Sequence, residues 1–210
     1  MDKQLLRAVT ALAAALLLTA CSEAPRPAES KKGDVPAKAE PPGPPEAVAG
    51  RTAFYEMYKP ARAWATDLLP LTLASGEVPG IKNDDGKAGM WTAVFVSPSR
   101  GEARTFVYAV VDHGSDIHRG VSARGAQAWS GPTPQSRPFQ ITEFSINSDE
   151  AFKTASKTAA AWLKRHPGQK VSITLANTAR FRTPVWYIMW GSRKSGYLAF
   201  VNATTGLAMK

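Results

Sequence analysis

The clearest amphipathic segment of the chain is NSDEAFKTASKTAAAWLKRHPG, residues 147–168. Its apolar side chains recur at helical spacing and share one face. Asn147 and Glu150 stand three residues apart, as in a capping box, and Pro167-Gly168 follows the basic end. The pattern predicts a helix that begins at Asn147 and packs Trp162 into a core.

After this segment the period of the pattern changes to two. KVSITLAN, TPVWYIMWG and GYLAFVNA are rich in branched and aromatic residues, and the polar GSRKSG predicts a hairpin loop. Alternate side chains of a strand point to opposite faces, here Trp186, Ile188 and Trp190 to one and Val185, Tyr187 and Met189 to the other. Both faces are apolar. One is expected to pack on the helix, and the other to be covered by the first half of the chain, by a loop such as 119–136, or by a partner.

Aromatic and Met residues are enriched in the cores of protein interfaces. We therefore hypothesise that the exposed side of this sheet binds a protein, with Trp186, Trp190, Tyr187 and Met189 as the candidate residues. The alternative is a strand that is buried on both faces within the chain. Burial of both tryptophans within the chain would contradict the hypothesis.

The earlier part of the chain shows the same order of patterns. TAFYEMYKPARAWATDLLPL is apolar at helical spacing in two pieces, broken near Pro60, and MWTAVFVSPSRGEARTFVYAVVDHG predicts a hairpin in which Trp91 corresponds to Trp186. RPFQITEFSI has the pattern of a strand that leads into the second helix. We predict two repeats, residues 51–136 and 137–210, in an α+β domain whose antiparallel sheet carries helices on one face.

The motif TPVWYIMWG…GYLAFVNATTGLAMK follows a capped helix that begins with acidic residues. Together they resemble the PepSY domain over about 65 residues. Trp186, Tyr187 and the run Asn202-Ala203-Thr204-Thr205-Gly206 stand at the signature positions. Asn202 replaces the usual Asp, and Leu207 replaces an acidic or polar residue. PepSY modules occur in propeptides of secreted thermolysin-like metallopeptidases and in many membrane-attached proteins, so the resemblance implies inhibition or regulation of a peptidase.

The N-terminus has the pattern of a secretory signal peptide over residues 1–20, because a short apolar run follows Lys3 and Arg7. The following Leu18-Thr19-Ala20-Cys21 resembles a bacterial lipobox, which implies that Cys21 becomes the first mature residue and carries lipid. Cys21 is the only cysteine, so it has no disulfide partner in the chain. Ser22 replaces the Asp that retains such proteins in the inner membrane. The pattern therefore implies an outer-membrane anchor facing the periplasm.

Residues 21–50 hold the lipidated Cys and a segment dominated by Pro, Ala, Lys and Glu without any aromatic residue. Such a segment cannot bury enough apolar surface to offset its backbone entropy. We predict a disordered tether that could reach about 90 Å when fully extended.

The formal net charge of +9 lies entirely in residues 51–210, which hold 20 Lys and Arg against 11 Asp and Glu. Basic charge beside a membrane favours anionic lipid or an acidic partner. The basic residues stand in scattered pairs rather than in a stripe, so no nucleic-acid partner is expected.

DHGSDIH, residues 112–118, is the only cluster of His and Asp, yet no ligand spacing supports a metal site there and a solvated loop is expected. GVSARG lacks the second Gly of a nucleophile elbow, and NDDG lacks the closing Glu of a calcium loop. Asn202-Ala203-Thr204 fits a glycosylation sequon, but turn chemistry explains it better in a bacterial protein.

The sequence contains no cofactor motif and no catalytic constellation. The expected function is therefore a non-enzymatic envelope lipoprotein whose PepSY-like domain binds an unidentified envelope protein or peptide, with the membrane as a second partner through Cys21. The alternatives are an inhibitor or regulator of an envelope peptidase, and a structural or assembly lipoprotein.

Overall fold

The computed structural model describes residues 45–210. The predicted signal peptide, the predicted lipidation at Cys21 and most of the predicted tether lie outside these residues. The described part contains an eight-stranded antiparallel sheet with two helices packed against it, which confirms the α+β class. The helices are α1 (Gly50–Trp64) and α2 (Ser148–Arg165), and a short 3-10 turn, η1, spans Ile141–Glu143. The strands are β1 (Val48–Ala49), β2 (Leu69–Gly76), β3 (Lys87–Ala88), β4 (Met90–Ser97), β5 (Glu102–Ala109), β6 (Gly120–Ala128), β7 (Val171–Asn177), β8 (Pro184–Trp190), β9 (Tyr197–Asn202) and β10 (Ala208–Met209).

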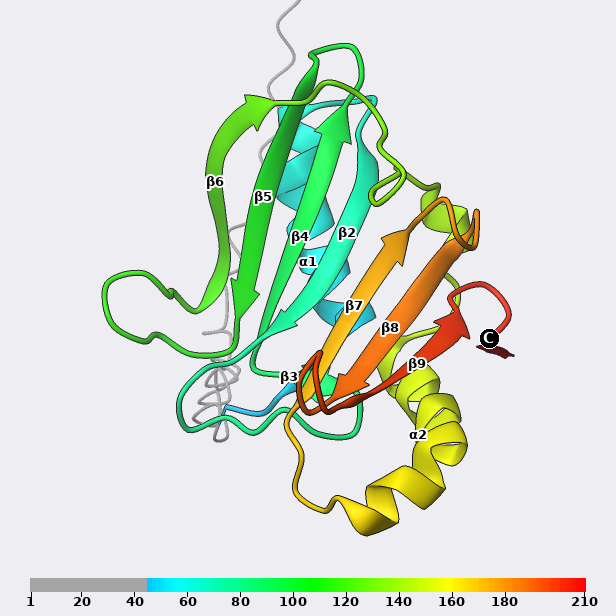
Figure 1. The fold of residues 1–210 in the computed structure, drawn as a ribbon. Coiled ribbons are helices and arrows are strands. Elements are labelled where there is room, and N and C mark those ends of the chain that lie inside the picture. The colour runs from blue at the N-terminus through cyan, green and yellow to red at the C-terminus, as the bar shows by residue number, and fades with distance from the viewer. Residues whose placement is uncertain (1–44) are drawn as a thin grey trace, which may run out of the picture. The chain divides into compact units, whose positions relative to one another are not determined.

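The strand order of the large sheet is β10-β9-β8-β7-β2-β4-β5-β6, and β2 pairs antiparallel with β7 in its middle. In the first half, residues 48–128, α1 is followed by β2, β4, β5 and β6 (Figure 1). In the second half, residues 146–210, α2 is followed by β7, β8, β9 and β10. Each half therefore consists of a helix followed by four strands of the large sheet. In both halves the first of these strands lies at the centre of the sheet and the last at its edge. The division predicted between residues 136 and 137 falls within the segment that connects them.

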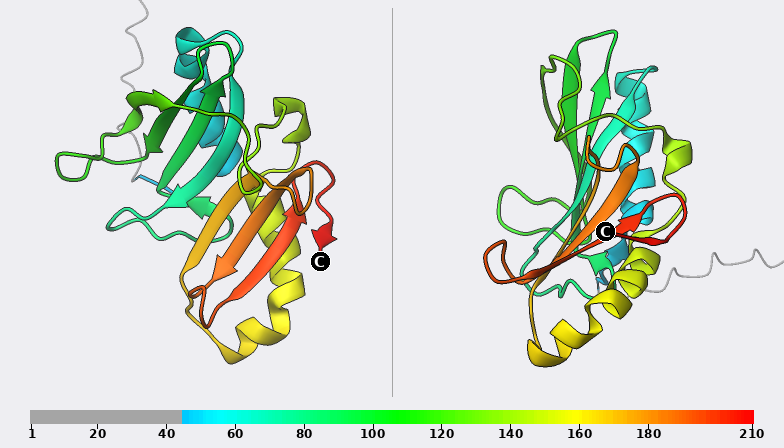
Figure 2. Two further views of the ribbon diagram at one scale, coloured as in Figure 1. Left: turned by 45° about the horizontal axis from the view of Figure 1, so that its top comes forward. Right: turned by 45° about the vertical axis from the view of Figure 1, so that its right-hand side comes forward.

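Both helices lie on one face of the sheet, as Figure 2 shows from the side. We call the other side the open face. The core lies between the helices and the sheet and includes Phe54 and Met57 of α1, both fully buried. Helix α1 continues through Pro60, so the predicted break there is wrong. Proline removes only one backbone hydrogen bond, and buried Ala61 keeps the last turn of α1 on the core.

Trp91 and Trp186 are fully buried, and their rings meet edge to face with centroids 6.5 Å apart. The indole nitrogen of Trp91 donates to the carbonyl of Val48 at 2.9 Å, and that of Trp186 donates to the carbonyl of Ile146 at 3.0 Å. Each accepting carbonyl belongs to the second residue before a long helix. The two tryptophans that correspond in the sequence are therefore also equivalent in the structure. Both are fully buried, and both donate to a carbonyl just before a long helix.

The two helices also begin beside each other. The backbone N–H of Gly50 donates to Oγ of Ser148 at 2.7 Å, and the N–H of Arg51 donates to Oδ1 of Asn147 at 2.9 Å. A Cβ at Gly50 would lie only 3.1–3.3 Å from carbons of buried side chains, so glycine allows this close approach. Asn147 and Glu150 form the predicted capping box of α2, which confirms that expectation.

The segment between β6 and α2 crosses part of the open face of the first half (Figure 1). Backbone hydrogen bonds fix both ends of this segment. The N–H of Trp129 donates to the carbonyl of Gly101 at 2.8 Å, and the N–H of Phe139 donates to the carbonyl of Pro70 at 3.0 Å. The strand predicted from RPFQITEFSI is absent from this segment of the structure, which has the turn η1 instead. Val96 alternates away from the helices on β4 but is fully buried, in agreement with a covered face.

Residues 48–50, the end of the predicted tether, belong to the folded part. Strand β1 pairs antiparallel with β3, Val48 opposite Ala88 and Ala49 opposite Lys87, and Ala49 is buried. The folded domain therefore begins before residue 50.

Candidate binding groove on the open face

Trp186 and Trp190 lie on the face of β8 that packs against the helices. Trp186 is fully buried and only 3% of Trp190 is exposed. The ring of Trp190 lies 5.6 Å from the ring of Phe152 in α2. This burial contradicts the hypothesis made from the sequence, in which both tryptophans belong to the binding side of the sheet, because the alternation of β8 directs them into the core.

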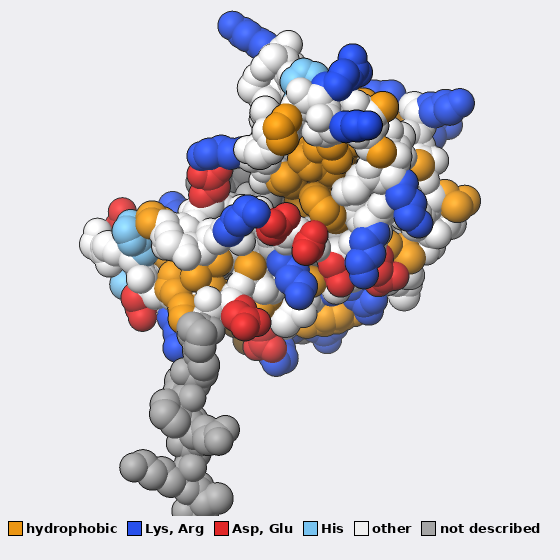
Figure 3. Space-filling view, turned by 90° about the horizontal axis from the view of Figure 1, so that it is seen from below, with side chains coloured by type: hydrophobic (Ala, Val, Ile, Leu, Met, Phe, Trp, Pro, Cys, Tyr) orange, Lys and Arg blue, Asp and Glu red, His pale blue; other side chains and the backbone are white. Residues whose placement is uncertain are grey.

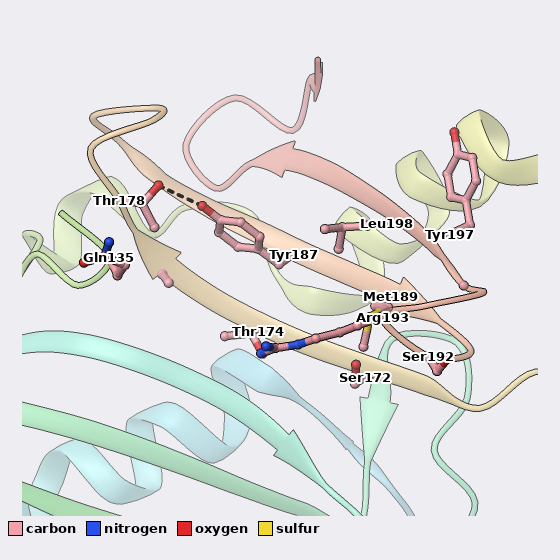
Figure 4. Close-up of a pocket in the computed structure, with 12 residues that line it drawn as sticks. Gln135, Ser172, Thr174, Thr178, Tyr187, Met189, Ser192, Arg193, Tyr197 and Leu198 are labelled. Atoms are coloured by element: carbon pink, nitrogen blue, oxygen red, sulfur yellow. Dashed lines mark hydrogen bonds between the residues drawn. The ribbon is translucent and has the colours of Figure 1, made fainter.

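Tyr187 and Met189 alternate to the open face and are half-buried. A groove of about 470 Å³ lies over them, within the range of about 300–1,000 Å³ that ligand sites occupy. Its floor is formed by β7, β8 and β9 (Figure 4). The residues that line it are Gln135, Ser172, Thr174, Ala176, Thr178, Tyr187, Met189, Ser192, Arg193, Gly196, Tyr197 and Leu198.

Two turns from distant parts of the sequence contribute to the lining of this groove. The turn that carries Gln135 is fixed to the second half, because the N–H of Ala179 donates to the carbonyl of Pro134 at 2.8 Å. The β8–β9 turn contributes Ser192, whose carbonyl accepts the N–H of Gly196 at 2.7 Å. Both turns are held by backbone hydrogen bonds, so the groove exists without a ligand.

The side chain of Tyr187 is held in place from two sides. Its hydroxyl lies 2.9 Å from Oγ1 of Thr178, and its ring meets the ring of Phe200 edge to face at 5.3 Å. Phe181 packs on Phe200 with ring centroids 5.1 Å apart. These contacts give the open face of the second half an ordered aromatic cluster.

Two arginines border this face. The guanidinium of Arg180 lies over the ring of Phe200 at 4.5 Å and over that of Phe181 at 4.7 Å, distances typical of cation–π contacts. The exposed side chain of Arg193 extends from the β8–β9 turn over the floor of the groove towards Thr174 (Figure 4). Neither arginine takes part in an ion pair within residues 45–210.

Tyr197 lines the groove in a different way from Tyr187. Its hydroxyl donates to the carbonyl of Thr158 in α2 at 3.3 Å, and its ring is directed to the helix side (Figure 4). The side chain that β9 presents to a ligand in the groove is therefore that of Leu198, which is 45% exposed.

The other residues considered from the sequence lie outside the groove. Asp112 and His118 are on an exposed loop, with Oδ1 of the aspartate 3.9 Å from Nδ1 of the histidine. Within residues 45–210 no three His, Cys, Asp or Glu side chains come together as metal ligands. GVSARG is part of the edge strand β6, and NDDG is in the loop before β3.

Asn202 is confirmed as a turn residue. Its Oδ1 accepts the N–H groups of Thr204 at 2.8 Å and of Thr205 at 2.9 Å. Gly206 closes the turn at a φ of 74°, a conformation that favours glycine. The side-chain amide of Asn202 is thus held by the backbone of the turn through its oxygen, in agreement with the turn interpretation.

Sequence reasoning missed Arg180, Arg193 and Gln135. One signal could have pointed to the arginines: residues 151–210 contain ten Lys and Arg and no Asp or Glu. No local pattern marks Gln135, which reaches the groove only because the turn around it is bonded to Ala179.

Within the part of the chain that the structure describes, neither long helix combines the length and apolar character needed to cross a membrane. No protein-family model matches the chain, and no curated protein matches it at a significant level. A solved structure of a candidate lipoprotein from Clostridium difficile 630 is similar, with a TM-score of 0.47 and 9% identity over 75% of this chain and 90% of that one. The resemblance to PepSY domains stays a prediction from the C-terminal motif.

Proposed function

We propose that this chain is a non-enzymatic binding module of the bacterial cell envelope, and that its groove holds an extended segment of another envelope protein. The observation that carries the proposal is the groove over β7, β8 and β9, which is formed in the free chain. Its apolar floor and its hydroxyl, amide and guanidinium groups suit a peptide that offers both side chains and backbone.

The chemistry of the lining also favours binding over catalysis. The groove residues include no carboxylate, imidazole or thiol, so none of the usual general bases faces its interior. Ser172 and Ser192 have no such base beside them in the lining, and a serine without a base is a weak nucleophile.

We place the module on the membrane through a lipid at Cys21, facing the periplasm from the outer membrane where the organism has one. This part of the proposal rests on the lipobox-like sequence and on Ser22. Labelling cells with a palmitate analogue should mark the full-length chain, and the Cys21→Ala variant should lose the mark. A variant that keeps the label would show that Cys21 is not the anchor.

Site-specific photo-crosslinking in cells tests the binding function. A benzoylphenylalanine at Leu198, which lines the groove, should trap an envelope protein, whereas the same group at Val121 on β6 should not. Both positions are exposed, at 45% and 37%. An excess of the trapped segment as a free peptide should abolish the product. A product of equal yield at both positions would contradict a groove-specific partner.

The same material tests the inhibitor alternative that the family resemblance implies. The full-length protein would be added to envelope peptidases and their turnover measured. Unchanged rates would discard the inhibitor function while leaving the binding function intact.

A further inference from the structure

The two halves of the sheet differ sharply in charge. Residues 51–150 hold ten Lys and Arg against eleven Asp and Glu, and residues 151–210 hold ten Lys and Arg and no acid. The whole positive excess of the domain therefore belongs to residues 151–210, which form β7 to β10 and all of α2 except its first three residues. A positive field on this half attracts an anionic partner and repels a cationic one.

Two exposed arginines stand on this face, Arg193 in the lining of the groove and Arg180 outside it. Arg180 lies against the aromatic cluster at the β9 side, and Arg193 reaches over the floor from the β8–β9 turn. Neither guanidinium is paired with a carboxylate in the described residues, so the hydrogen-bond donors of both are open to a ligand. A guanidinium presents donors in a fork that fits a carboxylate.

The ring of Tyr187 lies between the two arginines, because Tyr187 pairs with Thr174, towards which Arg193 extends, and with Phe200, which Arg180 covers. The floor of the groove is mostly apolar, with Met189 opposite Ser172 and Leu198 exposed. A ligand that satisfies both arginines must also cover this floor, which requires an apolar group between its two negative charges.

A second depression on the molecule differs from the groove because its lysines are paired with carboxylates. It has a volume of about 330 Å³ and is lined by Glu77, Lys82 and Lys170 among others. Lys170 pairs with Glu77 at 3.0 Å and Lys82 pairs with Asp84, so its cations already have partners. Figure 3, a view from below, shows acidic and basic side chains side by side on that side of the molecule.

We propose that the groove binds an extended peptide segment in which two carboxylate side chains flank an apolar residue, one carboxylate pairing with Arg193 and the other with Arg180. This inference rests on the binding function proposed above. A concave site between the Gln135 turn and the β8–β9 turn favours a chain that enters it over a flat lipid surface.

Selection of nine-residue peptides from a random phage library on the full-length protein in detergent tests the inference. The selected peptides should carry Asp or Glu on both sides of an apolar residue. The tightest one should then lose about tenfold or more in affinity when its acids become Gln or Asn, because each loses a charge-assisted hydrogen bond. Fluorescence polarisation gives both affinities.

Three variants assign the contacts. Arg193→Gln and Arg180→Gln should each weaken the acidic peptide roughly 5–10-fold and leave its amide analogue unchanged. Arg124→Gln, on the exposed edge strand β6, is the matched control and should change neither affinity. All three side chains are exposed, and equal thermal unfolding of the variants would show that the fold is intact.

Each other outcome contradicts a different claim. Selected peptides without acids, or equal affinities for the acidic and amide forms, would overturn the acidic ligand and leave the binding groove in place. Failure to select any peptide would overturn both. Arginine-dependent binding to vesicles of phosphatidylglycerol, with no selected peptide, would replace the peptide by a lipid surface.

Discussion

The two halves of the sheet are built from the same elements but present different open faces. In the first half the segment after β6 crosses the open face, and the outward Val96 and Val107 are buried at 0% and 8% exposure. In the second half Met189 and Leu198 line the groove, and 45% of Leu198 is exposed. The segment between β6 and α2 thus crosses part of one face and contributes Gln135 to the lining of the groove on the other.

The cores of the halves, by contrast, are equivalent. Replacing Trp91 or Trp186 by Ala should cost about 3–5 kcal/mol of unfolding free energy in either case, because each indole is fully buried and bonded to a backbone carbonyl. Urea unfolding followed by fluorescence measures both. Leu207→Ala, at a 68% exposed position, is the control and should change stability by less than about 0.5 kcal/mol.

One cooperative transition is expected for both tryptophan variants, since their rings touch each other across the halves. Two separate transitions, with only one half unfolded by each change, would break the comparison. The halves would then be independent domains rather than one core.

Ser148→Ala should destabilise the junction of the halves by about 1–3 kcal/mol, because it leaves buried polar groups without a partner. Its Oγ accepts the N–H of Gly50 at 2.7 Å and donates to the carbonyl of Gly86 at 2.6 Å. Thermal or urea unfolding measures the loss. The neighbouring Ser145→Ala removes an exposed hydroxyl and serves as the control; equal losses would contradict the role of Ser148.

The mutation Tyr187→Phe should cost about 1 kcal/mol or less, since only the hydrogen bond to Thr178 is lost and the ring stays on Phe200. Thr178→Val should give a similar loss, and the double variant should not add to it. Fully additive losses would show that the two hydroxyls do not act as a pair.

The smallest expected effect is on stability at acid pH, and it is expected from a carboxylate of the first half. The hydroxyl of Ser97 and the N–H of Ser99 donate to the carboxylate of Asp67 at 2.6 and 2.8 Å and lower the pKa of Asp67 to about 2. The stabilisation is therefore present above the unfolded pKa of about 3.9 and is lost as the pH falls towards 2. Asp67→Asn should flatten the fall in unfolding midpoint over this window.

No residue of 151–210 can contribute such a carboxylate effect, because that segment contains no Asp or Glu. Glu150→Gln, at the start of α2, is a control in the capping box and should leave the Asp67-dependent slope unchanged. An unaltered acid profile in Asp67→Asn would contradict the assignment.

Much of the fold could be predicted from local patterns. Period-two alternation predicts that Tyr187 and Met189 lie on one face of β8 and Trp186 and Trp190 on the other, as observed. Helix α2 begins directly after the capping residue Asn147, which the sequence also predicts. Alternation could not say which face the helices cover, because both faces of β8 are apolar. The pattern therefore does not reveal that Trp186 and Trp190 belong to the core.

The site itself could not be predicted, because its parts meet only through the fold. Gln135 and Arg193 lie far apart in the sequence, and a backbone bond from Ala179 to Pro134 fixes the turn that carries Gln135. Arg180 is placed by contact with Phe200, which comes from another strand. Charge counts by segment point to this half, but not to the groove.

Backbone amide NMR of the full-length protein, titrated with the selected acidic peptide, tests the central claim that only the second half binds. Amide shifts should change along Ser172–Ala176, Tyr187–Met189 and Leu198–Phe200, and Arg193→Gln should reduce them. The amides of β4, β5 and β6 should stay in place. Changes confined to β4–β6, or spread equally over both halves, would contradict the account.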